Sequence, residues 1–196
     1  MALLSLQDVS VTYLSGGKRV HAINHVSLDV EKGESLGIVG ESGSGKTTLI
    51  MAVLRLLPPG RARVEGTAEL EGRDLFQMSD QELSTVRWEQ MSVVFQKAMN
   101  ALSPVHRIGK FLSDIYRLHR PDVNKRDARR AVEELLTLVN LPPRVFNLYP
   151  HELSGGMMQR VSIAMSLLFT PRLLIMDEAT TALDVVTQNQ ILDEIV

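Results

Sequence analysis

The first pattern that could do chemistry is a glycine-rich stretch at residues 40–47. It reads GESGSGKT and fits the spacing GxxxxGK(S/T) of loops that bind nucleotide phosphates. Glycines let consecutive backbone N–H groups point at one anion, and the N-terminus of a following helix adds positive potential. Lys46 can reach the β- and γ-phosphates, and the Thr47 hydroxyl can bind Mg²⁺. The pattern predicts a site for a nucleoside triphosphate with magnesium; the alternative is a glycine-rich turn with an incidental lysine.

Two adjacent carboxylates form a second pattern, 131 residues after Lys46. Asp177 and Glu178 directly follow the mainly apolar segment 172–176, which predicts a buried strand. Asp177 is placed to bind magnesium, and Glu178 is a candidate general base for a water molecule. Taken alone, such a pair more often caps a turn than acts in catalysis. After a phosphate loop, it becomes the expected second half of the site.

A serine followed by two glycines makes a third pattern at the start of a predicted helix, residues 154–169. Ser154 is a favourable N-cap residue, and Gly155 and Gly156 leave bare backbone N–H groups at that helix end. The pattern predicts a second anion site, which makes sense if it serves a nucleotide held by another subunit. The alternative is an ordinary N-cap with glycines for a tight bend.

These motifs need elements that position them. The short apolar run 35–39 precedes the phosphate loop and a helical stretch 46–57 follows it, so we expect strand, loop and helix in succession. Before them, residues 9–13 and 20–30 alternate apolar and polar side chains around the turn signal Gly16-Gly17, which predicts two antiparallel strands.

The rest of the chain divides into short strands and a helical block. Ser79 with Glu82 has the capping-box spacing and predicts a short helix. Residues 97–153 show helical patterns with polar joints and proline stops, so we interpret them as a helical insertion. The other expected elements are strands at 64–70, 91–95 and 172–176 and helices at 154–169 and 185–196.

Composition limits the class of protein. The chain has 196 residues, 44% of them hydrophobic and 22% charged, which is typical of a globular protein. It has no cysteine, which excludes disulfides, iron–sulfur clusters and thiolate zinc sites in these residues. The net charge of −2 gives no reason to expect nucleic acid as a partner. The longest apolar run is 49–54, so we expect neither a signal peptide nor a spanning helix, and a membrane connection through a partner.

Three further features complete the pattern. Gln96 follows the predicted strand 91–95, Asp184 ends an Ala-Leu-Asp triplet after the acidic pair, and Tyr13 lies on the first strand. With them the chain resembles the nucleotide-binding domain of ABC transporters over essentially its whole length. The resemblance implies an α/β fold: a P-loop NTPase core of the ABC type with an antiparallel β subdomain and an inserted helical subdomain. The core would comprise residues 1–96 and 154–196, and the helical signature subdomain residues 97–153.

The resemblance also implies ATP and Mg²⁺ as ligands and a role for each motif. Glu178, Gln96 and Lys46 would be the catalytic residues. Thr47, Gln96 and Asp177 would bind the magnesium ion. Tyr13 would stack on adenine, with a packed surface ring as the alternative. The full set expected to contact nucleotide is Tyr13, Gly40, Ser42, Gly43, Ser44, Gly45, Lys46, Thr47, Thr48, Ser154, Gly155, Gly156 and Asp184.

Three stretches narrow the resemblance to one group of importers within the family. Residues 95–104, 149–157 and 180–186 are similar to the ATP-binding subunits of dipeptide, oligopeptide and nickel importers. Met157 replaces the glutamine common across ABC proteins, as in this importer group, and Ala179 replaces a usual proline without removing either carboxylate. The resemblance implies an ATPase subunit that powers import of peptides or nickel. An exporter or an importer of another solute is the alternative.

The same resemblance implies partners and a location. A second ABC ATPase subunit, identical or related, would pair head to tail with this one. Integral membrane permease subunits and, indirectly, an extracytoplasmic solute-binding protein would join at the cytoplasmic face of the membrane, to which this chain would bind peripherally. ATPases of DNA repair and chromosome organisation carry long coiled coils for which the interval 96–153 is too short and too rich in proline. Translation-associated ABC proteins carry two cassettes where this sequence has one.

One family feature is missing from these residues. The family has a switch histidine after the catalytic glutamate, whereas all five histidines here precede Glu178 and the sequence stops 18 residues beyond it. We therefore expect a C-terminally truncated domain that hydrolyses ATP poorly.

Overall fold

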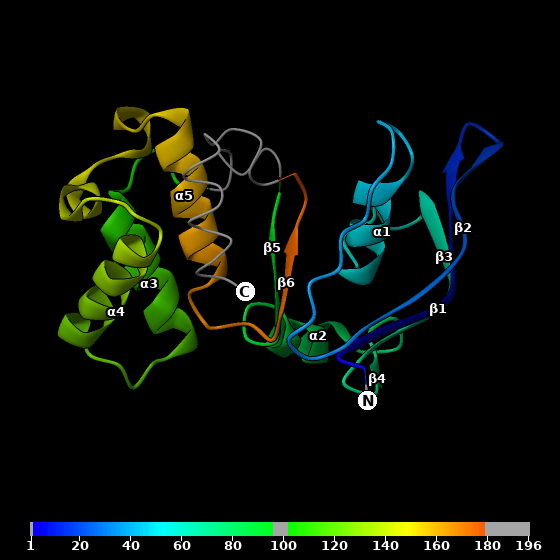
Figure 1. Ribbon diagram of the computed structural model, residues 1–196, viewed down its shortest axis with the longest axis horizontal. Coiled ribbons are helices and arrows are strands. Elements are labelled where there is room, and N and C mark those ends of the chain that lie inside the picture. The colour runs from blue at the N-terminus through cyan, green and yellow to red at the C-terminus, as the bar shows by residue number, and fades with distance from the viewer. Residues whose placement is uncertain (1, 96–101, 179–196) are drawn as a thin grey trace. The chain divides into compact units, whose positions relative to one another are not determined.

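The computed structural model describes residues 2–95 and 102–178 (Figure 1). Contacts divide the chain into two compact units, Met1–Arg87 and Trp88–Val196. The fold is α/β, as expected. The partition into a core of 1–96 and 154–196 with 97–153 inserted stays a prediction. Of the helices that the structure describes, none is long and apolar enough to cross a membrane.

The first unit is built on an antiparallel sheet with the strand order β2-β1-β3-β4 (Figure 1). β1 (Leu4–Ser15) and β2 (Lys18–Val30) are joined at Gly16 and Gly17, whose φ angles are 55° and 79°. Glycine takes two such angles in succession without steric cost, and the predicted hairpin is confirmed. β3 (Ala62–Leu70) pairs with the other edge of β1, and β4 (Arg73–Asp74) pairs with β3. The buried face of this sheet includes Leu6, Val9, Val11, Ala68 and Leu70.

Two helices complete the first unit, and one of them is shorter than expected. α1 spans Lys46–Val53, four residues less than the predicted stretch 46–57. It ends because Arg55 takes a left-handed conformation (φ 51°) and the Leu56 N–H donates back to the Met51 carbonyl oxygen at 2.8 Å.

α2 (Asp80–Val86) opens with the predicted capping box. The Glu82 N–H donates to the Ser79 hydroxyl, and the Glu82 carboxylate accepts from the Ser79 N–H at 2.8 Å. The Ser79 hydroxyl, and after it the Ser79 backbone N–H, lower the pKa of the Glu82 carboxyl below its ordinary value.

The strand predicted at 35–39 is wrong. Within residues 2–95 and 102–178 this segment forms no strand pair, and Val39 is 97% exposed. An apolar run becomes a strand only when another strand accepts and donates its backbone hydrogen bonds, and composition alone does not provide that partner.

The second unit contains a parallel strand pair. β5 (Met91–Val94) and β6 (Leu173–Met176) run side by side, with Met91 opposite Leu173 and Val94 opposite Met176 (Figure 1). Both lie within stretches predicted as strands, 91–95 and 172–176, so these two predictions are confirmed.

Within the described part of the second unit, three α-helices pack together: α3 (Ile108–His119), α4 (Lys125–Leu138) and α5 (Gly155–Ser166). The short 3₁₀ turns Pro143–Asn147 and Pro150–Glu152 each begin at a predicted proline stop. Their shared core includes Ile108, Leu112, Val132, Leu136, Val161 and Ile163. α4 buries Ala128, Val132 and Leu136, which are four residues apart and therefore share one face. The helix predicted at 185–196 lies outside the described residues.

Candidate functional site

The phosphate loop ends where Lys46 begins α1. The Lys46 ammonium folds back over the loop, and its Nζ donates to the carbonyl oxygens of Gly40 at 2.7 Å and Glu41 at 3.0 Å. The first turn of α1 has no acidic side chain, so no carboxylate there offsets the positive end of the helix dipole. A cation and a helix N-terminus therefore act at the same short loop, which suits a polyanion.

The loop conformation requires glycine at two positions. The Ser44 N–H donates to the Glu41 carbonyl oxygen at 3.1 Å and closes a turn in which Gly43 has φ 83°. Gly45 has φ 98°, and a Cβ on it would lie 2.6 Å from the Ala22 carbonyl oxygen on β2. The start of α1 thus approaches the sheet more closely than any side chain at position 45 would allow.

The remaining loop residues lie around this turn. Ser42, Gly43, Ser44 and Thr47 are exposed, and a Cβ on Gly40 would lie 2.7 Å from the Ser44 Oγ. The cradle is therefore compact, open to solvent and made mainly of glycine and serine. These properties fit the phosphates of a nucleotide.

Tyr13 reaches the same end of α1 from the sheet. Its hydroxyl lies 3.4 Å from the Thr48 Oγ1, within hydrogen-bond reach, and the residue is half-buried on β1. Tyr13 pairs across the sheet with Val20 on β2 and Ala62 on β3. The ring is thus held near the phosphate loop, where an aromatic face could accept a base.

In the second unit, the two carboxylates follow β6. The Asp177 N–H donates to the Val94 carbonyl oxygen at 2.9 Å, which extends the β5–β6 ladder by one bond, and Asp177 is buried. Glu178 is exposed and takes a left-handed conformation with φ 50°. Such an angle is uncommon for a residue other than glycine and is found most often in turns and functional sites. Neighbouring carboxylates in such different settings can serve different roles.

Ser154 caps α5 as predicted. Its hydroxyl accepts the Met157 N–H at 3.3 Å, and the residue itself is exposed. The first turn of α5 has no acidic side chain, and a Cβ on Gly155 would meet no atom within 4 Å. The N-terminus of α5 is therefore sterically open.

The sequence analysis missed the contacts that hold the turn before Ser154. The Glu152 carboxylate accepts the Tyr149 N–H at 2.7 Å, and the rings of Tyr149 and His151 stack with centroids 5.5 Å apart. The Arg107 guanidinium lies 5.6 Å from the Tyr149 ring centroid. The three-residue spacing of Tyr149 and Glu152 resembles a capping box and was the available signal.

Two predicted site residues, Gln96 and Asp184, lie outside the described residues. Magnesium does not require a preformed cluster of protein carboxylates, because it is usually bound by one or two of them together with substrate phosphates and water. Thr47 and Asp177 are the described residues with suitable oxygen donors in the predicted set.

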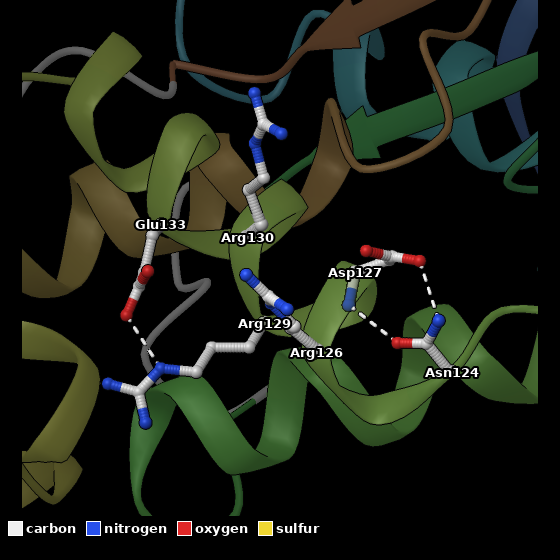
Figure 2. Close-up of a pocket in the computed structure, with 6 residues that line it drawn as sticks. All are labelled: Asn124, Arg126, Asp127, Arg129, Arg130 and Glu133. Carbon is white, nitrogen blue, oxygen red and sulfur yellow. Dashed lines mark hydrogen bonds and ion pairs between the residues drawn. The ribbon is translucent and has the colours of Figure 1, made fainter.

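A cavity of about 540 Å³ lies along the first half of α4 (Figure 2). Its lining residues are Asn124, Arg126, Asp127, Arg129, Arg130 and Glu133, none of which belongs to the predicted site. The Arg129 Nε donates a hydrogen bond to the Glu133 carboxylate at 2.8 Å, and the Asp127 N–H donates to the Asn124 side chain at 3.0 Å. Much of this surface therefore consists of side chains that stabilise α4 itself.

Comparison with known families gives a clear match. The family model described as ABC transporter matches residues 23–181 of this chain. The chain is 46% identical over 193 residues to the oligopeptide transport ATP-binding protein OppD of Mycobacterium tuberculosis, covering 97% of this chain and 31% of that protein. It is 42% identical to the proteins of the same name from Bacillus subtilis and Escherichia coli, covering 54% and 57% of their lengths. The chain thus spans between about a third and somewhat over half of these curated relatives.

Solved structures give the same match at the level of the fold. The dimeric structure of a bacterial ABC transporter cassette is similar with a TM-score of 0.88 and 30% identity, covering 97% of this chain and 80% of that one. A dimeric post-hydrolysis state of an ATP-binding cassette bound to ADP and Pi is similar with a TM-score of 0.87 and 30% identity.

Proposed function

This chain belongs to the ABC transporter family, and from that membership we propose that it is the ATP-binding and ATP-hydrolysing part of an importer for peptides. Peptides are favoured over nickel because the three relatives compared above, at 42–46% identity, are named as oligopeptide transport ATP-binding proteins. ATP and Mg²⁺ are the proposed ligands.

The observation that carries the ATP proposal is the position of the Lys46 ammonium. It lies on two carbonyl oxygens of its own loop, at the dipole-positive start of α1. A lysine held in this way needs little reorganisation to bind phosphate oxygens, since its charge already lies at the loop.

The residues expected to act on the phosphates, the metal ion and the attacking water have these proposed roles. Lys46 binds the β- and γ-phosphates, Thr47 and Asp177 bind Mg²⁺, and Glu178 accepts a proton from the attacking water. Bound magnesium would supply charge neutralisation at the phosphates. Gln96 would sense the metal and the γ-phosphate, and Asp184 would contact nucleotide.

Ser154 and Gly156 are proposed to act on a nucleotide held by a second ATPase subunit, identical or related. The open N-terminus of α5 and the dimeric arrangement of the similar cassettes support this proposal. We also propose that the ATPase pair works on permease subunits at the cytoplasmic face of the membrane, with a solute-binding protein acting on the other side.

The test measures binding and turnover in separate assays. The parent chain should bind Mg-ATP in titration calorimetry and release phosphate. Glu178→Gln should bind Mg-ATP as tightly as the parent. It should release phosphate more slowly by about a hundredfold or more, because glutamine keeps the shape of glutamate but cannot accept the proton.

Lys46→Ala is the matched control, since it should lose Mg-ATP affinity itself. A parent chain that binds no Mg-ATP would refute the proposed function. Parental turnover in Glu178→Gln would refute only the role of Glu178 as base.

A further inference from the structure

Arg87 connects the end of α2 with the end of α1, the helix whose first turn carries the phosphate loop. Its Nη2 donates to the Leu54 carbonyl oxygen at 2.6 Å and to the Arg55 carbonyl oxygen at 3.2 Å. Arg87 is also the C-cap residue of α2, where its backbone N–H donates to the Leu83 carbonyl oxygen at 2.9 Å. One side chain thus binds the two carbonyl groups that directly follow α1.

A second arginine ties the same helix end to a different segment. Arg55 donates from its guanidinium to the Met78 carbonyl oxygen and forms an ion pair of 3.4 Å with Asp80. Both guanidinium groups lie at the C-terminal end of α1, where the helix dipole favours positive charge. The C-terminal end of α1 is therefore held from two sides.

The guanidinium of Arg87 is poorly solvated at this position. Burial is the main cause that lowers the pKa of its guanidinium, with a further lowering by Arg55 and an opposing effect of Asp80. Its Nε is buried without a hydrogen-bond partner among the described residues. Burying a guanidinium with one N–H donor unsatisfied costs free energy, so the placement of Arg87 at the end of α1 lowers stability in this respect.

The other end of α1 is fixed independently. Gly45 packs directly against the Ala22 carbonyl group, and Thr48 lies within hydrogen-bond reach of Tyr13. α1 has eight residues and is about 12 Å long at about 1.5 Å per residue, so its two ends are only about two turns apart. With its start held against the sheet, a displacement of its end tilts the axis about that start and changes the direction of the N–H groups in the first turn.

We infer that Arg87 is a positioning residue for the triphosphate: by binding the Leu54 and Arg55 carbonyl groups it sets the axis of α1 and thereby the affinity of the phosphate loop. This inference rests on the proposed function, because it presumes that the loop binds nucleotide. Arg87 itself touches no phosphate. Its effect passes through α1, so it should concern the phosphate chain of the nucleotide and not the base.

The experiment compares Arg87→Gln with the parent in titration calorimetry, using Mg-ATP and inorganic tripolyphosphate as separate probes. Tripolyphosphate has no base, so it reports on the phosphate loop alone. We expect Arg87→Gln to weaken both probes by the same factor, roughly tenfold, since small misplacements of binding groups have large effects. Arg87→Lys keeps the charge and one donor direction and should show a smaller loss of both. Arg63→Gln is the matched control, because Arg63 is an exposed arginine of the same unit that pairs with Glu65 at 2.8 Å, and it should bind both probes like the parent.

A purely structural role would lower the melting temperature of Arg87→Gln but leave both affinities at the parental value below the transition, and that result would overturn the inference. A loss for Mg-ATP without a loss for tripolyphosphate would overturn it as well, because the effect would then concern the base. If Arg87→Gln does not fold, Arg87→Lys decides alone: weaker binding of both probes supports the inference, and parental binding refutes it. A parent that binds neither probe would instead refute the proposed function.

Discussion

At the scale of single residues, the candidate site depends on polar groups that are held before any ligand arrives. The Lys46 ammonium is held by two loop carbonyls, and the Ser154 hydroxyl by the Met157 N–H. Tyr13 lies beside Thr48, so its ring is near the start of α1. Preorganised groups lose little conformational entropy on binding, which favours affinity.

Tyr13 allows a test that separates its ring from its hydroxyl. Tyr13→Ala should weaken Mg-ATP binding by about 1 kcal/mol, or roughly fivefold in Kd, because it removes an aromatic face for adenine. Tyr13→Phe should bind like the parent, since it keeps that face. Titration calorimetry with Mg-ATP measures both.

Two controls accompany the Tyr13 variants. Thr48→Val removes the hydroxyl that faces Tyr13 and should leave the difference between Tyr13→Ala and Tyr13→Phe intact. Tripolyphosphate should bind Tyr13→Ala as well as it binds the parent. A loss of Mg-ATP affinity in Tyr13→Phe equal to that in Tyr13→Ala would show that the hydroxyl, and not stacking, is the important group.

At the scale of elements, α3 and α4 of the second unit both contact the buried ring of Phe146. Phe146, in the 3₁₀ turn Pro143–Asn147, packs against Gly109 of α3 on one side. The Arg129 guanidinium of α4 also lies over this ring, 4.5 Å from its centroid. A glycine is required on α3 because a Cβ there would lie 2.2 Å from the Phe146 ring.

We expect Gly109→Ala to destabilise the second unit by about 1–3 kcal/mol, even though alanine is the better helix former. The added methyl group has to displace a ring that is only 9% exposed, and the contacting atoms include Cγ, close to the backbone. Urea unfolding, with the tryptophan fluorescence of Trp88 as the probe, measures the change.

Gly155→Ala is the comparison for this variant, since a Cβ there meets no atom within 4 Å and the residue begins a helix. It should unfold at the parental urea concentration or above. Equal stability of Gly109→Ala and the parent would mean that the Phe146 ring is not confined as the structure indicates.

At the scale of the whole molecule, the predicted site residues are distributed over both compact units. The phosphate loop belongs to Met1–Arg87, whereas Asp177, Glu178 and Ser154 belong to Trp88–Val196. Under the proposed function, Ser154 serves a nucleotide on a second subunit. In a symmetric pair the interface is isologous, so each subunit contributes the same surfaces to it.

Mixing two inactive variants tests this arrangement. Under the proposed function, Lys46→Ala should lose phosphate binding and Ser154→Arg should block the start of α5, so each alone should have little ATPase activity. A mixed head-to-tail pair retains one complete site, and random pairing should restore about a quarter of the parental activity. Phosphate release from the mixture, compared with each variant alone, measures the recovery. Activity of the mixture no higher than the average of the two separate variants would refute the action of Ser154 on a second subunit.

Much of this protein is specified by short stretches of sequence, because the interactions concerned join residues close together in the chain. The glycine pair at 16–17, the Ser79–Glu82 capping box and the Ser154 cap each depend on hydrogen bonds or φ angles within a few residues, and the structure contains all three. The phosphate loop is similar, since its turn and the Lys46 bonds span residues 40–46. For these features the residue types alone suffice.

Tertiary structure decided the features that need a partner far away in the chain. Segment 35–39 has the composition of a buried strand but no ladder partner among the described residues. The steric restriction at Gly109 comes from Phe146, which lies 37 positions later in the chain. The hydrogen bond of Arg87 to the end of α1 joins it to Leu54, 33 positions earlier. A sequence pattern indicates whether a residue favours burial or a particular dihedral angle. It does not indicate which group will pack beside that residue, because this depends on how distant segments of the chain pack together.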